Sequence, residues 1–266
     1  MKLPLSIGGK IPLKLPSKIW YKLFGYGFII YCVSLIINFP AHIAWQFVPT
    51  AATQSIRFNA IEGTIWHGRI SGLTISGLDV GQLNWKLKPL SLLLAQLELD
   101  TSLNGNNKKM QGKFAFTADG LINGQSISGS LQAAQLNPYT LPISLQGMLT
   151  IDIQTLQYQQ GTTLSIVGDL KWNNASVDMV QAVELGKVEV VIQPAPNGIG
   201  LKVKNSDSAL AVDGTITLDV KGLYQTNLGL FNRDPTRTDI ATIIQMIGKP
   251  DATGRVYLRQ RGNLPL

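Results

Sequence analysis

The chain has 266 residues and a formal net charge of +7, from 23 lysine and arginine residues against 16 aspartate and glutamate residues. Five of the lysines fall within residues 1–22, where there is no acid, so the rest of the chain holds 18 basic and 16 acidic residues. A nucleic-acid-binding surface needs a basic patch on the folded part, so we expect no nucleic-acid partner. Arg255, Arg259 and Arg261 form a local arginine cluster, which fits a solvated strand face.

Residues 23–39 carry no charged side chain and directly follow the lysine-rich stretch. A helix of this length covers roughly 25 Å, slightly less than a bilayer core, and the apolar stretch continues to Val48. We therefore predict a transmembrane signal anchor over residues 23–48. Because short lysine-rich flanks stay cytoplasmic, we expect residues 1–22 to form a cytoplasmic basic tail and residues 56–266 to lie across the membrane.

A cleaved signal peptide is the competing interpretation of the apolar segment. Signal peptides have an apolar core of roughly 7 to 15 residues and then a small-x-small cleavage site. Here the core is longer, and residues 39–44 offer no clean pair of small residues. A buried core helix of a soluble protein would leave the lysine-rich flank unexplained. The pattern favours an uncleaved anchor.

Apolar and polar residues alternate through most of the chain after residue 56, which is typical of strands with one apolar and one wet face. The clearest run is 145–153, and others lie at 83–87, 97–99, 127–133, 188–192, 201–203, 216–220 and 256–258. Turn-forming pairs recur along the chain, among them Asp119-Gly120, Asn123-Gly124 and Asp213-Gly214. We predict a mostly β fold, a long antiparallel meander of roughly 12 to 15 strands.

Two short helices interrupt this pattern. The apolar run 89–96 predicts one or two helical turns, with Pro89 at a permissible first position. Isoleucines at 240, 243, 244 and 247 form a helical stripe, which Asp234 or Thr236 would cap and Gly248 and Pro250 would end. We expect the second helix to lie against the sheet or to plug one end of it.

A meander with one apolar face must hide that face in a sandwich, a barrel or a curled groove. Few long crossovers interrupt the short runs, which favours an extended, curled sheet, although the periodicity does not separate this from a sandwich. Residues 56–266 contain no sign of a domain boundary.

The sequence carries no recognisable catalytic or metal-binding constellation. His42 and His67 lack a partner at metal-ligand spacing, and Cys32 is the one cysteine, so the chain cannot form an internal disulfide or a CxxC site. No GxSxG, HExxH or P-loop motif is present. The triplet 174–176 matches a glycosylation acceptor and is interpreted as a turn. We therefore expect no enzyme activity, metal or cofactor.

The most distinctive segment is EGTIWHG at residues 62–68. Taken structurally, it predicts a tight turn at Gly63, a strand edge, a second turn at Gly68 and a tryptophan, Trp66, that fills core space. It also resembles the GT-[LIV]-W-x-G signature of the type II secretion system protein N family.

Further segments resemble this family in order and spacing. They are FPA at 39–41, VGQLNWKLKPLSLL at 80–93, LP and SLQG within 141–147, GDLKW with Ala175 at 168–175, and IGKPDATGR at 247–255. The resemblance covers most of residues 39–260. It singles out structural or contact candidates, which we expect to be structural first: Gly63, Thr64, Trp66, Gly68, Trp85, Pro89, Gly254 and Arg255.

The resemblance implies an accessory component of a bacterial secretion machine. Family members lie in the inner membrane and support the export of folded proteins from the periplasm across the outer membrane. It implies a single-pass protein with a cytoplasmic N-terminus and a periplasmic β-rich domain. Its partners would be the inner-membrane platform of the type II secretion system or the outer-membrane secretin.

A lipid-binding groove is the second hypothesis. An anchor followed by a long, one-sided sheet is similar to AsmA-like membrane-anchored groove proteins. A curled sheet lined by leucine, isoleucine and valine would bind or shuttle lipid, with Leu149 and Ile151 facing inward.

Overall fold

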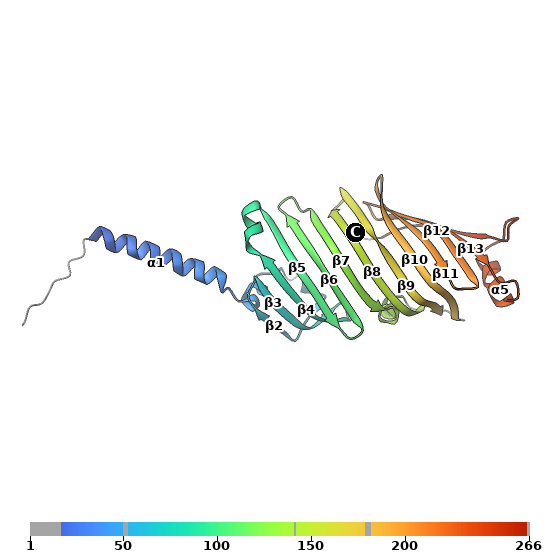
Figure 1. Ribbon diagram of the computed structural model, residues 1–266, viewed down its shortest axis with the longest axis horizontal. Coiled ribbons are helices and arrows are strands. Elements are labelled where there is room, and N and C mark those ends of the chain that lie inside the picture. The colour runs from blue at the N-terminus through green and yellow to red at the C-terminus, as the bar shows by residue number, and fades with distance from the viewer. Residues whose placement is uncertain (1–16, 50–52, 141, 179–181, 265–266) are drawn as a thin grey trace, which may run out of the picture.

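A long N-terminal helix and a single large sheet make up the computed structural model (Figure 1). The structure describes residues 17–49, 53–140, 142–178 and 182–264. Most of the predicted cytoplasmic tail, residues 1–16, lies outside the described residues.

Helix α1 (Ser17–Ile37) is long and apolar enough to cross a membrane, with a mean hydropathy of 1.5 over Trp20–Ile37. The helical part of the predicted segment 23–48 ends at Ile37 and does not continue to Val48. Pro40 stands directly before a separate short helix, α2 (Ala41–Trp45), in which Ala41 is buried. Proline disrupts a helix that would run through it, so the apolar residues after Pro40 serve a different element.

The sheet is an antiparallel meander of 14 strands in which neighbours in sequence pair in space, except that β1 and β2 both pair with β3. The strands are β1 (Ile56–Arg57), β2 (Ala60–Gly63), β3 (His67–Ile75), β4 (Leu78–Lys88), β5 (Gln96–Gly105), β6 (Lys108–Thr117), β7 (Ile122–Gln132), β8 (Ser144–Gln159), β9 (Thr163–Asp178), β10 (Ala182–Ala195), β11 (Gly198–Ser206), β12 (Leu210–Asp219), β13 (Leu223–Asn232) and β14 (Val256–Asn263). This confirms the predicted mostly β class with an extended, curled antiparallel sheet.

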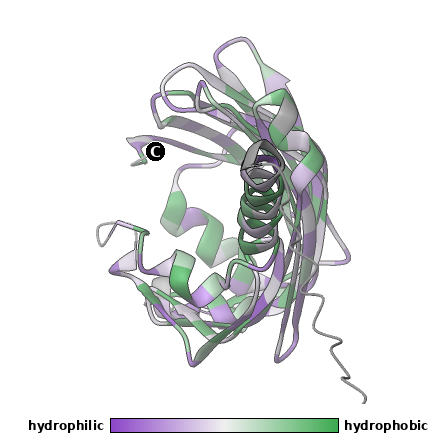
Figure 2. Ribbon diagram, turned by 90° about the vertical axis from the view of Figure 1, so that its left-hand side faces the viewer, coloured by the Kyte–Doolittle hydropathy of each residue, from purple (hydrophilic) through white to green (hydrophobic). Residues whose placement is uncertain are grey.

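The sheet is strongly curved but stays open and does not close into a barrel (Figure 2). Residues directly opposite one another on paired strands share a face, and one such row of direct partners runs Leu103, Met110, Gly129, Ile151, Leu170, Val190 and Val203. This apolar face is the concave one, since helix α5 (Thr238–Ile247) packs on it and lies inside the curve. This face is therefore apolar from β5 to β11, and Leu210, Leu230 and Val256 continue it to β14.

The convex face is polar and pairs opposite charges across strands. Asp100 lies between Lys86 and Lys113, and Glu189 lies between Lys171 and Lys204. Cross-strand pairs of opposite charge contribute modestly to sheet stability and specify register.

Several predicted turns lie inside strands instead. Asp119-Gly120 does form the turn between β6 and β7, but Asn123-Gly124 lies within β7, Asp213-Gly214 within β12 and the triplet 174–176 within β9. At Gly214 a Cβ atom would lie 2.1 Å from the Asn227 carbonyl oxygen. That glycine permits a close approach of backbones within the sheet, and the prediction of a turn there was wrong.

Two clusters of buried apolar residues occur in the described part of the chain, one at each end of the sheet. Near α1, Ile70, Leu73 and Val80 form the proximal cluster. At the far end, Ile240 and Ile244 of α5 pack on the strands to form the distal cluster, with Leu210, Leu230 and Val256. Between the clusters, the inward side chains of β8, such as Leu149 and Ile151, stay partly exposed.

The two predicted helices are present, with differences at their ends. Residues Pro89–Leu94 form a 3₁₀ helix, η1, with Pro89 at its first turn. Helix α5 buries Ile240 and Ile244 of the predicted stripe and stops at Gly248. Its N-cap is Arg237 without a side-chain cap, so the prediction of Asp234 or Thr236 was wrong: the Asp234 carboxylate instead accepts from the backbone and hydroxyl of Thr236. Two further short elements, η2 (Ala133–Leu136) and α4 (Asn137–Thr140), link β7 to β8.

Candidate functional site

The loop Thr64–Trp66 joins β2 to β3 and is closed by two glycines. Gly63 and Gly68 are opposite one another in the ladder, and the Thr64 N–H donates to the His67 carbonyl oxygen at 2.9 Å. Gly63 has φ +94°, and a Cβ atom there would lie 2.5 Å from the His67 carbonyl oxygen. Only glycine adopts this conformation easily, so Gly63, the last residue of β2, lets the chain turn into the loop.

Trp66 connects this loop to the end of α1. Its indole Nε1 donates to the Ile36 carbonyl oxygen at 2.9 Å, and the Ile65 N–H donates to the Phe39 carbonyl oxygen at 3.0 Å. Pro40 and Thr64 form an isolated antiparallel bridge beside them. The last carbonyl groups of a helix lack intrahelical donors, so the loop supplies donors at the helix exit. Trp66 is thus a link between helix and sheet and not the core filler that the sequence suggested.

Trp85 of β4 holds the same loop from the sheet side. Its indole Nε1 donates to the Ile65 carbonyl oxygen at 3.1 Å, and the Leu87 N–H donates to the Trp66 carbonyl oxygen at 2.6 Å. Its ring covers Gly68, where a Cβ atom would lie 2.5 Å from Cζ2 of the ring. Gly68 is a strand residue, so the predicted turn there was wrong; its lack of a side chain leaves room for the Trp85 ring.

Helix α2 braces the junction from another direction. Trp45 contacts Phe58 edge to face, with 5.1 Å between ring centroids, and α2 packs against β2. Aromatic pairs of this geometry add modestly to the burial of their area. The junction between α1 and the sheet is therefore built from backbone hydrogen bonds, two indole donors and an aromatic pair.

Pro89 directly follows β4 and is the first residue of η1. Ser91 is buried and donates to the Lys88 carbonyl oxygen at 3.2 Å, while Leu90 and Leu94 point into solvent. Lys88 pairs with Glu98 at 2.9 Å, a contact that raises the pKa of the lysine. Pro89 therefore has a structural role as the first residue of this turn.

Gly254 and Arg255 lie at the opposite end of the sheet, between α5 and β14. The Asp251 carboxylate accepts from the N–H groups of Thr253 and Arg255, and its hydrogen bond with the Thr253 hydroxyl is the main cause that lowers its pKa. Gly254 has φ +77°. The candidates thus do not form one site: six gather near α1, and two shape the distal turn.

Arg255 clamps the last strand to β12. Its Nη1 lies 2.7 and 2.8 Å from the two carboxylate oxygens of Asp213, and the arginine side chain lies over Gly229 of β13. This contact raises the pKa of the guanidinium. The sequence could not show this pair because Asp213-Gly214 looked like a turn.

The contacts of Ile36 and Phe39 with the loop were also missed. Both act through backbone carbonyl oxygens, which carry no signal in the identity of a side chain. The FPA segment at residues 39–41 resembled the family, but nothing in it indicated a hydrogen bond from the loop to Phe39.

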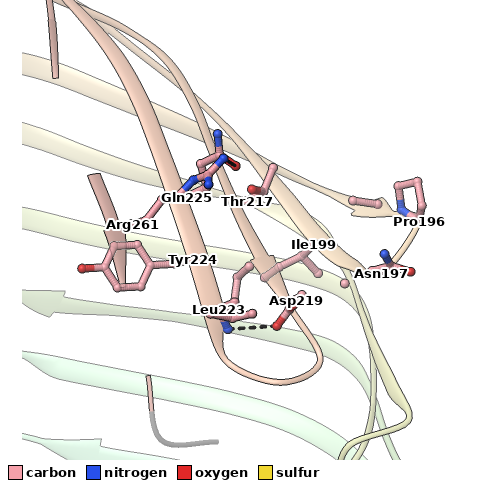
Figure 3. A pocket seen from close by; sticks show the side chains of 12 residues that line it. Pro196, Asn197, Ile199, Thr217, Asp219, Leu223, Tyr224, Gln225 and Arg261 are labelled. Atoms are coloured by element: carbon pink, nitrogen blue, oxygen red, sulfur yellow. Dashed lines mark hydrogen bonds between the residues drawn. The ribbon is translucent and has the colours of Figure 1, made fainter. Parts of the chain in front are cut away.

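A surface cavity of about 480 Å³ lies at the ends of the β10–β11 and β12–β13 hairpins (Figure 3). Ile199, Leu218 and Tyr224 supply apolar walls, and Arg261 donates to Gln225 at 3.4 Å. The Asp219 carboxylate accepts from the Leu223 N–H at 2.9 Å, the dashed line in Figure 3. This carboxylate thus organises a turn, and none of the lining residues pairs a nucleophile with a base. Within the described residues no group of three or more histidine, cysteine or acidic side chains could hold a metal ion.

Comparisons with known proteins agree on one family. The family model described as "Type II secretion system (T2SS), protein N" matches residues 54–259. A type II secretion system protein N of Vibrio cholerae serotype O1 is 25% identical over 256 residues, covering 90% of this chain and 98% of the relative. One from Aeromonas hydrophila is 23% identical over 243 residues, covering 89% and 95%. No solved structure matches.

Proposed function

The chain belongs to the type II secretion system protein N family, and from this we propose that it is an inner-membrane accessory component of that system. It supports the export of folded proteins from the periplasm across the outer membrane through protein–protein contacts. Helix α1 anchors it, the lysine-rich N-terminus stays in the cytoplasm, and the sheet lies in the periplasm.

The observation that carries this proposal is the junction between α1 and the sheet. A loosely tethered domain would hang from a polar linker, whereas here Trp66 and Ile65 bond to the carbonyl groups of residues 36 and 39. The sheet is therefore held in a defined orientation to the helix. A fixed orientation suits a component that presents a surface to neighbours within an assembly.

The free edge of β14 is the contact surface that we infer. It ends the sheet in the part of the chain that the structure describes, and most of its side chains are exposed. An open edge can pair with a strand of another protein. Arg259 and Arg261 lie on its convex side and favour a partner strand with acidic side chains, on the inner-membrane platform or the secretin.

A complementation experiment tests the function. In a strain that lacks the gene, exported enzymes should accumulate in the periplasm while general export continues, and the wild-type chain should restore secretion. Trp66→Phe removes the indole donor at the helix exit and should restore it poorly. Trp172→Phe is the matched control, because the Trp172 indole donates at 2.8 Å to Gln146 inside the sheet, far from α1 in sequence.

Two results would count against the proposal. Unchanged secretion in the deletion strain would place the protein in another process. If both tryptophan variants restore secretion equally, at equal amounts of protein in the membrane, the contact of Trp66 with α1 is not needed for secretion.

Lipid binding is the second candidate, and the partly exposed concave face favours it. Apolar faces of this extent are normally covered, yet between the two buried clusters the inward side chains of β8 remain partly exposed. Lipid acyl chains would cover them. A photo-crosslinker at Leu149 or Ile151 should then capture lipid, while one at Thr150 on the convex side should not; no lipid at any of these positions would reject the idea.

A further inference from the structure

We propose that the 3₁₀ helix η1 inserts its leucines into the interface of the membrane that α1 spans, as a second and peripheral membrane contact. This inference rests on the proposed function, because it needs α1 to be in a bilayer. The occupant is the outer face of that bilayer, at the level of the headgroups and the first acyl carbons.

The exposure of the leucines is the first argument. Leu90 is 77% exposed, Leu94 is 74% and Leu92 is 44%, all within six residues. Scattered exposed leucines are ordinary in proteins, but three on one short turn form a concentrated apolar tip. The turn stays rigid because Pro89 starts it, buried Ser91 bonds back to Lys88, and Ala95 ends it in the left-handed region at φ +54°.

The position of η1 relative to α1 is the second argument. Leu87 bonds to the backbone of Trp66, which in turn bonds to the last turn of α1, and η1 begins two residues after Leu87. In Figure 1 the helical turn before β5 lies at the end of the sheet nearest α1. It is drawn above the point where that helix ends, at about the same position along the direction of the helix. A bilayer around α1 therefore has its surface at the same position along the helix axis as η1.

The charge pattern is the third argument. Residues 89–97 carry no charged side chain, and neither do residues 39–56, which follow α1 in the sequence. Phe47 is 78% exposed. The adjoining Lys88 is bonded to Glu98 on the strand side. Uncharged, leucine-rich tips beside a membrane anchor fit interfacial insertion, where apolar side chains leave water at no cost in buried charge.

A two-point attachment would fix the tilt of the sheet. A single helix leaves the domain free to rock about its exit point, whereas a second contact displaced from the helix axis limits that motion. The concave face begins next to η1, where Leu87 and Leu99 are paired. Insertion of η1 would thus hold this end of the curved sheet against the bilayer.

Fluorescence of the full chain in vesicles of phosphatidylethanolamine and phosphatidylglycerol tests this. An environment-sensitive NBD label is placed at Leu90→Cys or Leu94→Cys, each combined with Cys32→Ser. Nitroxide-bearing lipids should quench these labels several-fold more than a label at Met246→Cys, and aqueous iodide should show the opposite order. Met246 is the matched control because it is 80% exposed on a short helix at the distal end.

The native Cys32 separates the possible failures, because it lies within α1. If lipid nitroxides quench a label at Cys32 but the labels at residues 90 and 94 behave like the one at 246, η1 stays in water and the inference is wrong. If the Cys32 label is not quenched by lipid, α1 is not inserted, and the anchoring part of the proposed function fails with it. Quenching at 32, 90 and 94 but not at 246 supports the inference.

Discussion

The two ends of the sheet are closed by different means, whereas the inward side chains of β8 between them stay partly exposed. Near α1 the closure is a loop with two indole donors, backed by the proximal cluster. At the far end a helix lies on the apolar face and buries Ile240 and Ile244. Between them Leu149 and Ile151 of β8 stay partly exposed, although Ile127, Val188 and Ile192 on other strands of this middle region are buried.

This contrast shows what an extended sheet needs in order to be stable. Strands in the middle are held by a ladder on both sides, because each pairs with its neighbours in sequence. The end strands have one ladder only and need other contacts. The ends should therefore respond to mutations as packed cores do, and the middle as a surface does.

The largest difference should appear between two isoleucines. Ile244→Ala in α5 removes a side chain that is 3% exposed, and we expect a loss of about 2–4 kcal/mol in the free energy of unfolding from the lost burial and the cavity. Ile151→Ala in the open region should cost about 1 kcal/mol, because part of that side chain already contacts water. Urea denaturation of each purified full-length variant measures both.

Equal losses at the two positions would mean that something covers the middle of the sheet. In that case, removing bound lipid by extensive delipidation should lower the cost at Ile151 and leave the cost at Ile244 unchanged. This outcome would favour the lipid-groove candidate.

A glycine pair gives the next largest effect. Gly68→Ala places a Cβ atom 2.4 Å from the Glu62 carbonyl oxygen and 2.5 Å from the Trp85 ring, and we expect a loss of about 1–3 kcal/mol from overpacking. Gly200→Ala is the matched strand control, since its nearest neighbour would be the Ala195 Cβ at 4.0 Å. That control should be neutral or slightly stabilising.

The denaturant midpoints of the two glycine variants decide whether the junction is as tightly built as its distances indicate. If Gly68→Ala unfolds like Gly200→Ala, the Trp85 ring can move aside at little cost. Its role in holding the loop would then be weaker than its hydrogen bond to Ile65 indicates.

The sequence predicted the elements of this fold better than their ends and contacts. Alternation identified β8 and most other strands, because apolar and polar residues alternate along a strand that has one apolar and one solvated face. The clash distances at Gly68 and Gly214 come from neighbouring strands, so the sequence showed the glycines but not why they are there. The Arg255–Asp213 pair joins residues far apart in sequence, and no local pattern predicts such a partner.

The sequence identified the loop residues of the junction but not the hydrogen bonds that join them to the end of α1. Its motif drew attention to residues 63–68, whereas the acceptors at Ile36 and Phe39 are backbone groups. A hydrogen bond to a carbonyl oxygen constrains geometry and leaves the acceptor side chain free.

The smallest effect that we predict is a pH dependence confined to the distal end. The guanidinium of Arg237 is the main cause that lowers the pKa of Asp239, at the start of α5, to about 2. Since an unfolded aspartate has a pKa of about 3.9, the stabilising contribution of Asp239 is fully present above that value and is lost as the pH falls towards about 2. Asp239→Asn should therefore unfold at lower urea than the wild type at pH 6, and the difference should shrink between about pH 4 and pH 2.

The same titration separates the two ends of the sheet. The Asp239 side chain is partly exposed and that of its partner Arg237 is exposed, so salt should weaken the contribution of Asp239. The defect of Gly68→Ala is steric and should stay the same at every pH. If the difference between Asp239→Asn and the wild type stays constant down to pH 2, a lost charge interaction is not its cause. The start of α5 would then depend on the shape of the side chain at residue 239.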